Sequence, residues 1–279
     1  MKRSISILIS GGALLLVVSC VTTSSAGDSA ISPPDEAARL ATCREFGPQS
    51  PRDIDDPRGE NPLLFSLAPG YDRMNLCNIH LHESAEHKAE AFSIPVAAGR
   101  NEHGGYRCAI SDELTRVELR SPATPICSGL EPGDTIEVHW VYSSCDVHPG
   151  EGLGACMSDT CANPDLRVEA QVFTLVNDPS ALAFDDFGYA GSRTGLHHQA
   201  ASLPVGTGSP VTYLGSTTGP SYSDEQCSPL QVTWSVRPRC AKLDINTLGS
   251  WCRSNPFRED HAHGVRELVT DPALLAPIR

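Results

Sequence analysis

Eleven cysteines in a chain of 279 residues constrain the fold more than any other feature of the sequence. Ten remain when Cys20, which ends an apolar N-terminal run, is set aside. An even set in an exported chain indicates a disulfide framework. The alternative is a cysteine-bound zinc site, but the chain has no Cys-x-x-Cys pair, and Cys156 and Cys161 lack a second matching pair. We therefore expect up to five disulfides, whose pairing the sequence leaves open.

The first twenty residues predict export. Lys2 and Arg3 precede an apolar run at 5–18, which is shorter than the roughly 20 residues of a membrane span and typical of a secretory signal. The run leads into Val-Val-Ser-Cys, ending at Cys20, which resembles the bacterial lipobox, where the cysteine is lipidated and becomes the new N-terminus. The alternative is simple cleavage nearby, for example after Ala26. We expect a periplasmic protein or an outer-membrane lipoprotein, with the cell surface as a further location.

Three segments are expected in the chain. Residues 1–20 form the signal peptide with its lipobox, 21–40 are rich in Ser, Thr, Ala and Pro and predict a flexible tether, and 41–279 form a single domain. The formal net charge of −13 disfavours a nucleic-acid partner, because an acidic surface repels phosphates. The only membrane contact expected is the N-terminal lipid anchor.

The residue pattern of the domain predicts a mainly β fold with few short helices. Gly- and Pro-rich turns separate short segments that alternate or are rich in β-branched residues. The strongest strand patterns lie at 78–82, 135–142, 166–176 and 230–236, and the best short helix patterns at 35–44 and 83–92. Residues 143–163 carry three cysteines and are expected to form a disulfide-stapled insertion between two strands.

Two predicted strands carry a candidate metal site. His80 and His82 are one residue apart, and alternate side chains of a strand share a face. On a second strand the same period places Glu137, His139 and Val141 together. Three neutral imidazoles leave one tetrahedral position open, which is the catalytic arrangement of zinc. Glu137 is suited to accept a hydrogen bond from a metal-bound histidine. The same histidines also suit cobalt or cadmium.

The runs CNIHLHESAEHKAEAF and GDTIEVHWVYSSCDV resemble the δ class of carbonic anhydrase. Four further pieces resemble the α class in matching order along the chain. They are QSP with Asp-Ile after it at 49–54, Glu86-His87, the run YLGSTTGP at 213–220 with VTWSV after it, and NPFR at 255–258. The long gap between His82 and His139 and the residues Thr217 and Gly219 depart from the α-class pattern.

The resemblance implies a central, largely antiparallel sheet like that of the α-class fold, and reversible zinc-dependent hydration of carbon dioxide to bicarbonate and a proton. It implies His80, His82 and His139 as ligands and a metal-bound hydroxide as nucleophile. Thr218 would accept a hydrogen bond from that hydroxide and donate its own to Glu86.

The resemblance further implies that Val141 lines the pocket for carbon dioxide and that Cys43 pairs with Cys227. Hydration also needs a proton carrier, for which a solvent-facing histidine is suited. The sequence offers His103, His148, His197 and His198 without choosing among them.

Two other functions fit part of the pattern. The spacing of His80, His82 and Glu86, with a Pro-Gly before His139, is also typical of a cupin, a metal-dependent isomerase or dioxygenase on a small β-barrel. A non-enzymatic surface binding module with incidental histidines is the third hypothesis.

Overall fold

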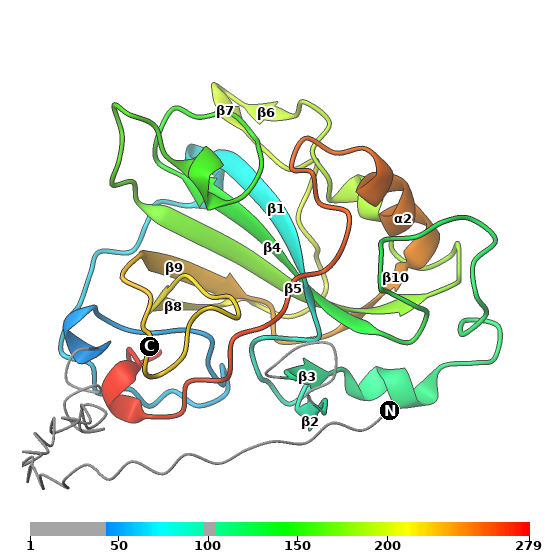
Figure 1. The fold of residues 1–279 in the computed structure, drawn as a ribbon, viewed down its shortest axis with the longest axis horizontal. Helices are drawn as coiled ribbons and strands as arrows, with labels where there is room; N and C mark the ends of the chain where they lie inside the picture. The colour runs from blue at the N-terminus through cyan, green and yellow to red at the C-terminus, as the bar shows by residue number, and fades with distance from the viewer. Residues whose placement is uncertain (1–42, 98–103) are drawn as a thin grey trace, which may run out of the picture. The chain divides into compact units, whose positions relative to one another are not determined.

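A six-stranded mixed sheet forms the centre of the domain (Figure 1). The computed structural model describes residues 43–97 and 104–279, all within one compact unit of the chain. Five strands follow the order β1-β4-β5-β9-β8, and β10 also pairs with β5. Their bounds are β1 Asn75–Glu83, β4 Thr135–Ser143, β5 Leu166–Val176, β8 Val211–Ser216, β9 Gln231–Val236 and β10 Ala241–Asp244. The expected mainly β fold is confirmed.

Strand β5 is the axis of this sheet. Strand β4 lies antiparallel between β1 and β5, and β8 lies antiparallel to β9. Strands β9 and β10 are both parallel to β5 and occupy successive parts of one edge, β9 opposite 167–170 and β10 opposite 173–176. The described strands therefore form an open sheet, so the small barrel that a cupin requires is not formed.

Small elements surround the sheet. Two-stranded sheets pair β2 (Ile94–Pro95) with β3 (Tyr106–Arg107) and β6 (Arg193–Thr194) with β7 (His197–His198). Helix α2 (Ile245–Arg253) follows β10 directly, and the Asp244 carboxylate caps it by accepting the Asn246 N–H. Single 3₁₀ turns lie at Tyr71–Arg73, Ala109–Glu113, Leu153–Cys156, Phe184–Asp186 and Pro272–Leu274. No helix among the described residues is both long and apolar enough to cross a bilayer.

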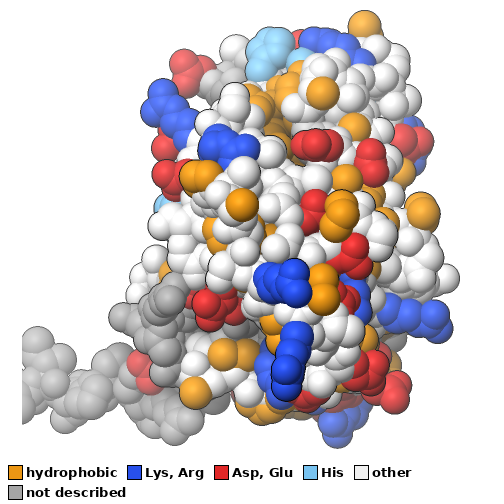
Figure 2. All heavy atoms as spheres, turned by 90° about the vertical axis from the view of Figure 1, so that its right-hand side faces the viewer, with side chains coloured by type: hydrophobic (Ala, Val, Ile, Leu, Met, Phe, Trp, Pro, Cys, Tyr) orange, Lys and Arg blue, Asp and Glu red, His pale blue; other side chains and the backbone are white. Residues whose placement is uncertain are grey.

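Both faces of the sheet are buried. Every residue of β4 is buried, so its successive side chains alternate between two buried faces of the sheet and not between core and surface. Ile136, Val138 and Trp140 pack with Leu248 and Trp251 of α2 in one hydrophobic core. The opposite face carries Val141 with Val168 and Trp234 in a second core, and it also holds the polar side chains described below. On the face that Figure 2 shows, acidic and basic side chains are interspersed over the surface.

Five disulfides connect the elements, as is typical of exported proteins. The pairs are Cys43–Cys227, Cys77–Cys156, Cys108–Cys240, Cys127–Cys252 and Cys145–Cys161. The first was implied by the resemblance and is confirmed. Two of them staple the segment between β4 and β5, as expected for the insertion at 143–163.

The helix expected at 83–92 is wrong. The segment instead makes isolated bridges, in which Ala85 pairs with Tyr106 and Ala89 with Phe92. The backbone N–H groups of Glu86 and His87 donate to the Glu137 carboxylate at 2.7 and 3.0 Å, so they are not available to a helix. The helix expected at 35–44 lies almost wholly outside the described residues.

Candidate metal centre

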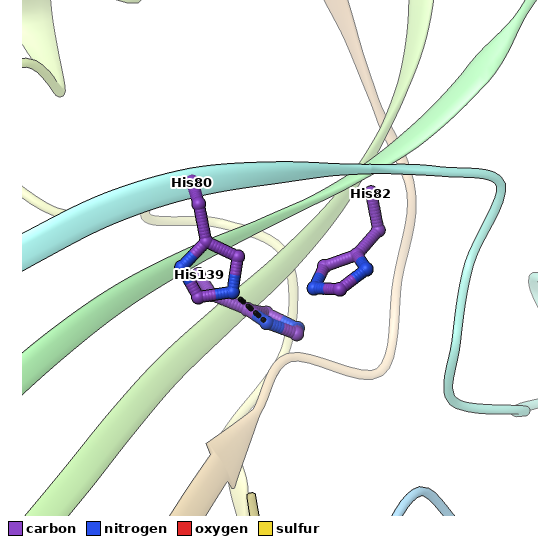
Figure 3. Close-up of side chains that lie close together, drawn as sticks. All are labelled: His80, His82 and His139. Carbon is purple, nitrogen blue, oxygen red and sulfur yellow. Dashed lines mark hydrogen bonds between the residues drawn. The ribbon is translucent and has the colours of Figure 1, made fainter. Parts of the chain in front are cut away.

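The register of β1 against β4 brings the predicted ligands together. A bulge between Leu76 and Asn78 sets the pairing, after which His80 lies opposite His139 and His82 opposite Glu137. The three imidazoles share one face of the sheet and converge (Figure 3). Their ring centroids are 4.6 to 5.0 Å apart, and one nitrogen of each lies within 4.8 Å of the others. The sequence hypothesis of a three-histidine group is consistent with this geometry.

Hydrogen bonds on the outer side of each ring determine which nitrogen carries the proton. His80 Nδ1 donates to Asn78 Oδ1 at 2.7 Å, and His82 Nδ1 donates to the Gly264 carbonyl at 3.1 Å. The Asn78 amide nitrogen donates to the Gly150 carbonyl, which orients its oxygen toward His80. In the neutral rings the other nitrogens, both Nε2, are therefore acceptors that point into the group.

His139 presents the opposite nitrogen. Its Nε2 donates to Glu137 Oε1 at 2.9 Å, which leaves Nδ1 as the acceptor, 3.2 Å from His80 Nε2. The dashed contact in Figure 3 therefore connects His80 Nε2 and His139 Nδ1, two nitrogens that each carry a lone pair and no proton. His82 Nε2 is buried without a hydrogen-bond partner among the described residues. Three lone pairs without a donor fit a divalent cation that prefers imidazole, such as zinc.

The Glu137 carboxylate is fully buried, and both of its oxygens accept hydrogen bonds. Besides the proton of His139, Oε1 accepts His87 Nδ1 at 2.7 Å, and Oε2 accepts two backbone N–H groups. His87 Nε2 in turn lies 2.6 Å from the Tyr213 hydroxyl. His87, Glu137 and His139 also form a group with metal-ligand atoms close together, but these contacts are hydrogen bonds. We therefore interpret this second cluster as a set of hydrogen bonds that orients His139.

The pKa shifts agree with neutral ligands. Burial lowers the pKa of His80 well below its usual range, and the neighbouring His139 and His82 lower it further. Burial likewise lowers the pKa of His82. Burial alone would raise the pKa of Glu137, but the charge of His87 and the hydrogen bonds from both imidazoles hold it well below the usual range. Neutral imidazoles beside an ionised carboxylate suit metal binding at neutral pH.

A cavity of ≈ 480 Å³ opens over the three histidines. Val141, Val168 and Trp234 from three adjacent strands form its apolar wall. Val141, which was predicted to line the carbon dioxide pocket, therefore lies beside the three histidines. Apart from Asn78 on β1, the rest of the lining comes from three loops, at 151–153 in the stapled insertion, 217–220 after β8, and 257–264 after α2.

The structure brings Thr218 to the cavity wall and Glu86 beneath His82. Glu86 Oε1 accepts the Arg266 backbone N–H at 2.9 Å and lies 3.7 Å from His82 Nδ1. Glu86 Oε2 is buried and has no hydrogen-bond partner among the described residues. The neighbouring Thr217 hydroxyl is instead hydrogen-bonded to Ser228. Of the two threonines, only Thr218 is left without a hydrogen bond in the described part of the chain.

Sequence reasoning missed several residues of this site. Asn78 orients His80 but was not singled out, although it shares the face of His80 and His82. His261 and His263 also line the cavity, and they repeat the spacing of His80 and His82. The residues around them show no strand pattern, so the sequence does not predict that these two histidines share a face.

Of the expected proton carriers, His148, His197 and His198 do not line the cavity. His103 and Cys20 lie outside the described residues.

Comparison with known proteins places this geometry in a family. Residues 71–247, more than half of the chain, match the family model of delta carbonic anhydrase. Among solved structures, the chain is similar to the α-carbonic anhydrase of Thermovibrio ammonificans in complex with the inhibitor sulfanilamide, with 14% identity, a TM-score of 0.27, and coverage of 82% of this chain and 91% of that one. No curated protein matches the chain. The matched region contains all three converging histidines, and the chain belongs to the delta carbonic anhydrase family.

Proposed function

We propose that this chain catalyses the reversible hydration of carbon dioxide at a zinc ion held by His80, His82 and His139. The observation that carries the proposal is the convergence of three imidazole lone pairs, each fixed by a hydrogen bond on the far side of its ring. Zinc held there would lower the pKa of a coordinated water to about 7 and supply a hydroxide nucleophile at neutral pH. Carbonic anhydrase is the standard example of that effect.

The residues around the ligands have separate tasks in this proposal. Glu137 keeps the proton of His139 on Nε2, so that Nδ1 stays available. The apolar wall of Val141, Val168 and Trp234 offers carbon dioxide a place without competing hydrogen bonds. The Thr218 hydroxyl would donate its proton in a hydrogen bond to Glu86 Oε2, which is otherwise unpaired among the described residues. The lone pairs of the Thr218 oxygen would then accept a hydrogen bond from the nucleophile and so orient it.

Metal analysis and a stopped-flow hydration assay on the same sample test the proposal. We expect about one zinc per chain and hydration that an aryl sulfonamide blocks. Each of the variants His80→Ala, His82→Ala and His139→Ala should lose most of the zinc and nearly all of the activity. Cobalt or cadmium should replace zinc in the same site. A zinc-loaded, fully active His139→Ala protein would overturn the assignment.

Thr218→Ala separates orientation from coordination. The variant should keep its zinc and lose turnover, because it removes a hydroxyl that orients the nucleophile and leaves all three ligands in place. Thr217→Ala is the matched control, since its hydroxyl is hydrogen-bonded to Ser228. Full activity of Thr218→Ala would show that this hydroxyl has no catalytic task.

A further inference from the structure

Hydration of carbon dioxide releases a proton that must leave the cavity. The reaction CO₂ + H₂O → HCO₃⁻ + H⁺ produces one proton per turnover, and a group that carries it must contact both the cavity and bulk water. Apart from the three proposed ligands, four carboxylate and imidazole side chains line the cavity in the described part of the chain. They are Glu151, Glu259, His261 and His263.

The two carboxylates are already engaged, and the side chain of His263 is 42% exposed against 54% for His261. Glu259 is buried, and its oxygens accept the Leu81 backbone N–H at 2.8 Å and His263 Nε2 at 3.0 Å. Glu151 forms an exposed ion pair with Arg258 at 3.3 Å. His263 is tied to Glu259 through its ring and to β1 through its backbone, where its N–H donates to the Leu81 carbonyl at 2.7 Å.

The histidines outside the cavity do not meet the requirement. His148 Nδ1 lies 3.0 Å from His198 Nε2, and neither residue contributes to the cavity wall. Both ring nitrogens of His198 are occupied, because Arg193 donates to Nε2 at 2.9 Å and Nδ1 lies 2.6 Å from the Tyr189 hydroxyl. A proton could enter that ring only by breaking one of these contacts.

His261 combines a fixed backbone with a free ring nitrogen. The segment is held because the Ser128 N–H donates to the Asp260 carbonyl at 2.9 Å. The side chain of His261 is 54% exposed, although it also lines the cavity. Its Nδ1 contacts Asp260 Oδ1 at 2.6 Å, and its Nε2 has no hydrogen-bond partner among the described residues. Its ring is 4.8 Å from that of His263, and no hydrogen bond connects the two in the described structure.

We propose that His261 carries protons between the cavity water and bulk solvent, with Asp260 as a positioning residue. The inference rests on the proposed function, because only hydration supplies the proton. Nε2 accepts the proton from cavity water and the ring becomes an imidazolium. The imidazolium then gives a proton to a buffer base in bulk water, which restores the neutral ring. The Asp260 carboxylate accepts a hydrogen bond from Nδ1–H, which holds that proton on Nδ1 and so keeps Nε2 as the basic nitrogen.

Kinetics in weak and strong buffer test this step. In weak buffer His261→Ala should lower kcat by roughly 10- to 100-fold, at or below the lower end of what a positioned acid–base group contributes. Its kcat/KM and its zinc content should stay near those of the wild type, because hydration itself does not need His261. Added imidazole should restore kcat. The matched control is His197→Ala, which should behave as wild type, since His197 lies outside the cavity lining.

A spectroscopic measurement on the metal-free protein gives a readout that does not depend on activity. Nitrogen-15 NMR should find the proton of neutral His261 on Nδ1 in the wild type. In Asp260→Asn the charged acceptor is lost, and we expect a shift toward the Nε2–H tautomer together with a partial loss of kcat in weak buffer. An unchanged tautomer would remove Asp260 from the proposal.

The outcomes separate the two proposals. An active wild type with an equally active His261→Ala in weak buffer would refute the relay and leave the proposed function intact. A wild type that binds one zinc but hydrates no carbon dioxide would refute both.

Discussion

At the scale of single residues, the centre depends on where each imidazole proton lies. Glu137→Gln tests this because an amide offers one acceptor oxygen where the carboxylate has two, and four donors contact that carboxylate. The ligands remain, so zinc should still bind, but with an affinity lower by about 10- to 100-fold. Competition with a fluorescent zinc chelator measures the difference.

A second buried carboxylate provides the control for that prediction. Glu169 accepts from Arg167 and Arg237 on another part of the sheet and contacts none of the proposed ligands. Glu169→Gln should lower stability while leaving zinc affinity unchanged. Equal losses of zinc affinity in both variants would mean that general loosening of the sheet, and not the tautomer of His139, governs metal binding.

The lowered pKa values of His80 and His82 make the metal-free protein sensitive to acid. An unfolded histidine titrates at about 6.5, so below that pH the unfolded chain binds more protons than the folded one. The contribution of these two groups to the free energy of unfolding should be at its full value above about pH 6.5 and fall as the pH drops toward the folded-state pKa values. His263, whose pKa is raised by the hydrogen bond to Glu259, acts with the opposite sign and only above about pH 6.5.

Urea unfolding in chelator between about pH 5 and pH 8 checks this dependence. The double variant His80→Asn/His82→Asn should have a flatter profile below about pH 6.5 than the wild type. The lowered pKa of His198 contributes equally to both proteins and cancels in the comparison. Parallel profiles would show that the two imidazoles are not the acid-sensitive groups.

The three converging histidines could be predicted from the sequence, whereas the outer parts of the site could not. Period-2 spacing on two strands is enough to place His80, His82 and His139 on shared faces. The match of His80 with His139 also requires a bulge near Cys77, which no spacing rule reveals. His261 reaches the cavity through a loop that bridges Ser128, a contact 133 residues away in the chain, so local pattern carries no information about it.

At the scale of elements, strands were predictable because β4 and β5 combine period-2 alternation with many β-branched and aromatic residues. The segment 83–92 looked helical for a local reason, since it is rich in Ala and Glu. Its conformation is decided by the distant Glu137, whose carboxylate takes two of its backbone N–H groups. Tertiary hydrogen bonds outweigh helix propensity in this segment.

The disulfide Cys77–Cys156 should stabilise the fold more than Cys145–Cys161. It closes a separation of 79 residues and ties β1 to the insertion, whereas the second closes 16 residues within the insertion. In the chain-entropy model these loops contribute about 4.5 and about 3 kcal/mol. The double variants Cys77→Ala/Cys156→Ala and Cys145→Ala/Cys161→Ala should therefore lose stability in that order in urea unfolding.

The same pair of variants also tests the cavity wall. Cys156 ends the turn that contributes Leu153 to the cavity, so loss of Cys77–Cys156 should also weaken binding of an aryl sulfonamide. Loss of Cys145–Cys161 should affect inhibitor binding less. The reverse order in both measurements would contradict this account of the insertion.

At the scale of the whole molecule, the structure describes the disulfide-linked domain, whereas predictions for the N-terminal segment rest on the sequence alone. The five disulfides agree with export, but residues 1–42, with the signal peptide, the tether and Cys20, lie outside the described residues. The proposal of a single catalytic domain at 41–279 is supported by the sheet, its two cores and the disulfides, which together connect segments from Cys43 to Cys252.

The lipid anchor is the last prediction, and it concerns where this domain works. A lipobox ending at Cys20 predicts that the protein expressed in a Gram-negative host incorporates labelled fatty acid and partitions into detergent. Each buried CH₂ of an acyl chain contributes about 0.8 kcal/mol to membrane binding, so an anchored protein should stay with the membrane in high salt. Cys20→Ala should abolish labelling and partitioning but leave zinc content and hydration unchanged, because residue 20 precedes the domain that holds the histidines. Val21, in place of Asp, favours the outer membrane, which sucrose-gradient fractionation would check. Wild-type protein recovered entirely in the soluble periplasm without lipid would disprove the anchor and leave the proposed chemistry untouched.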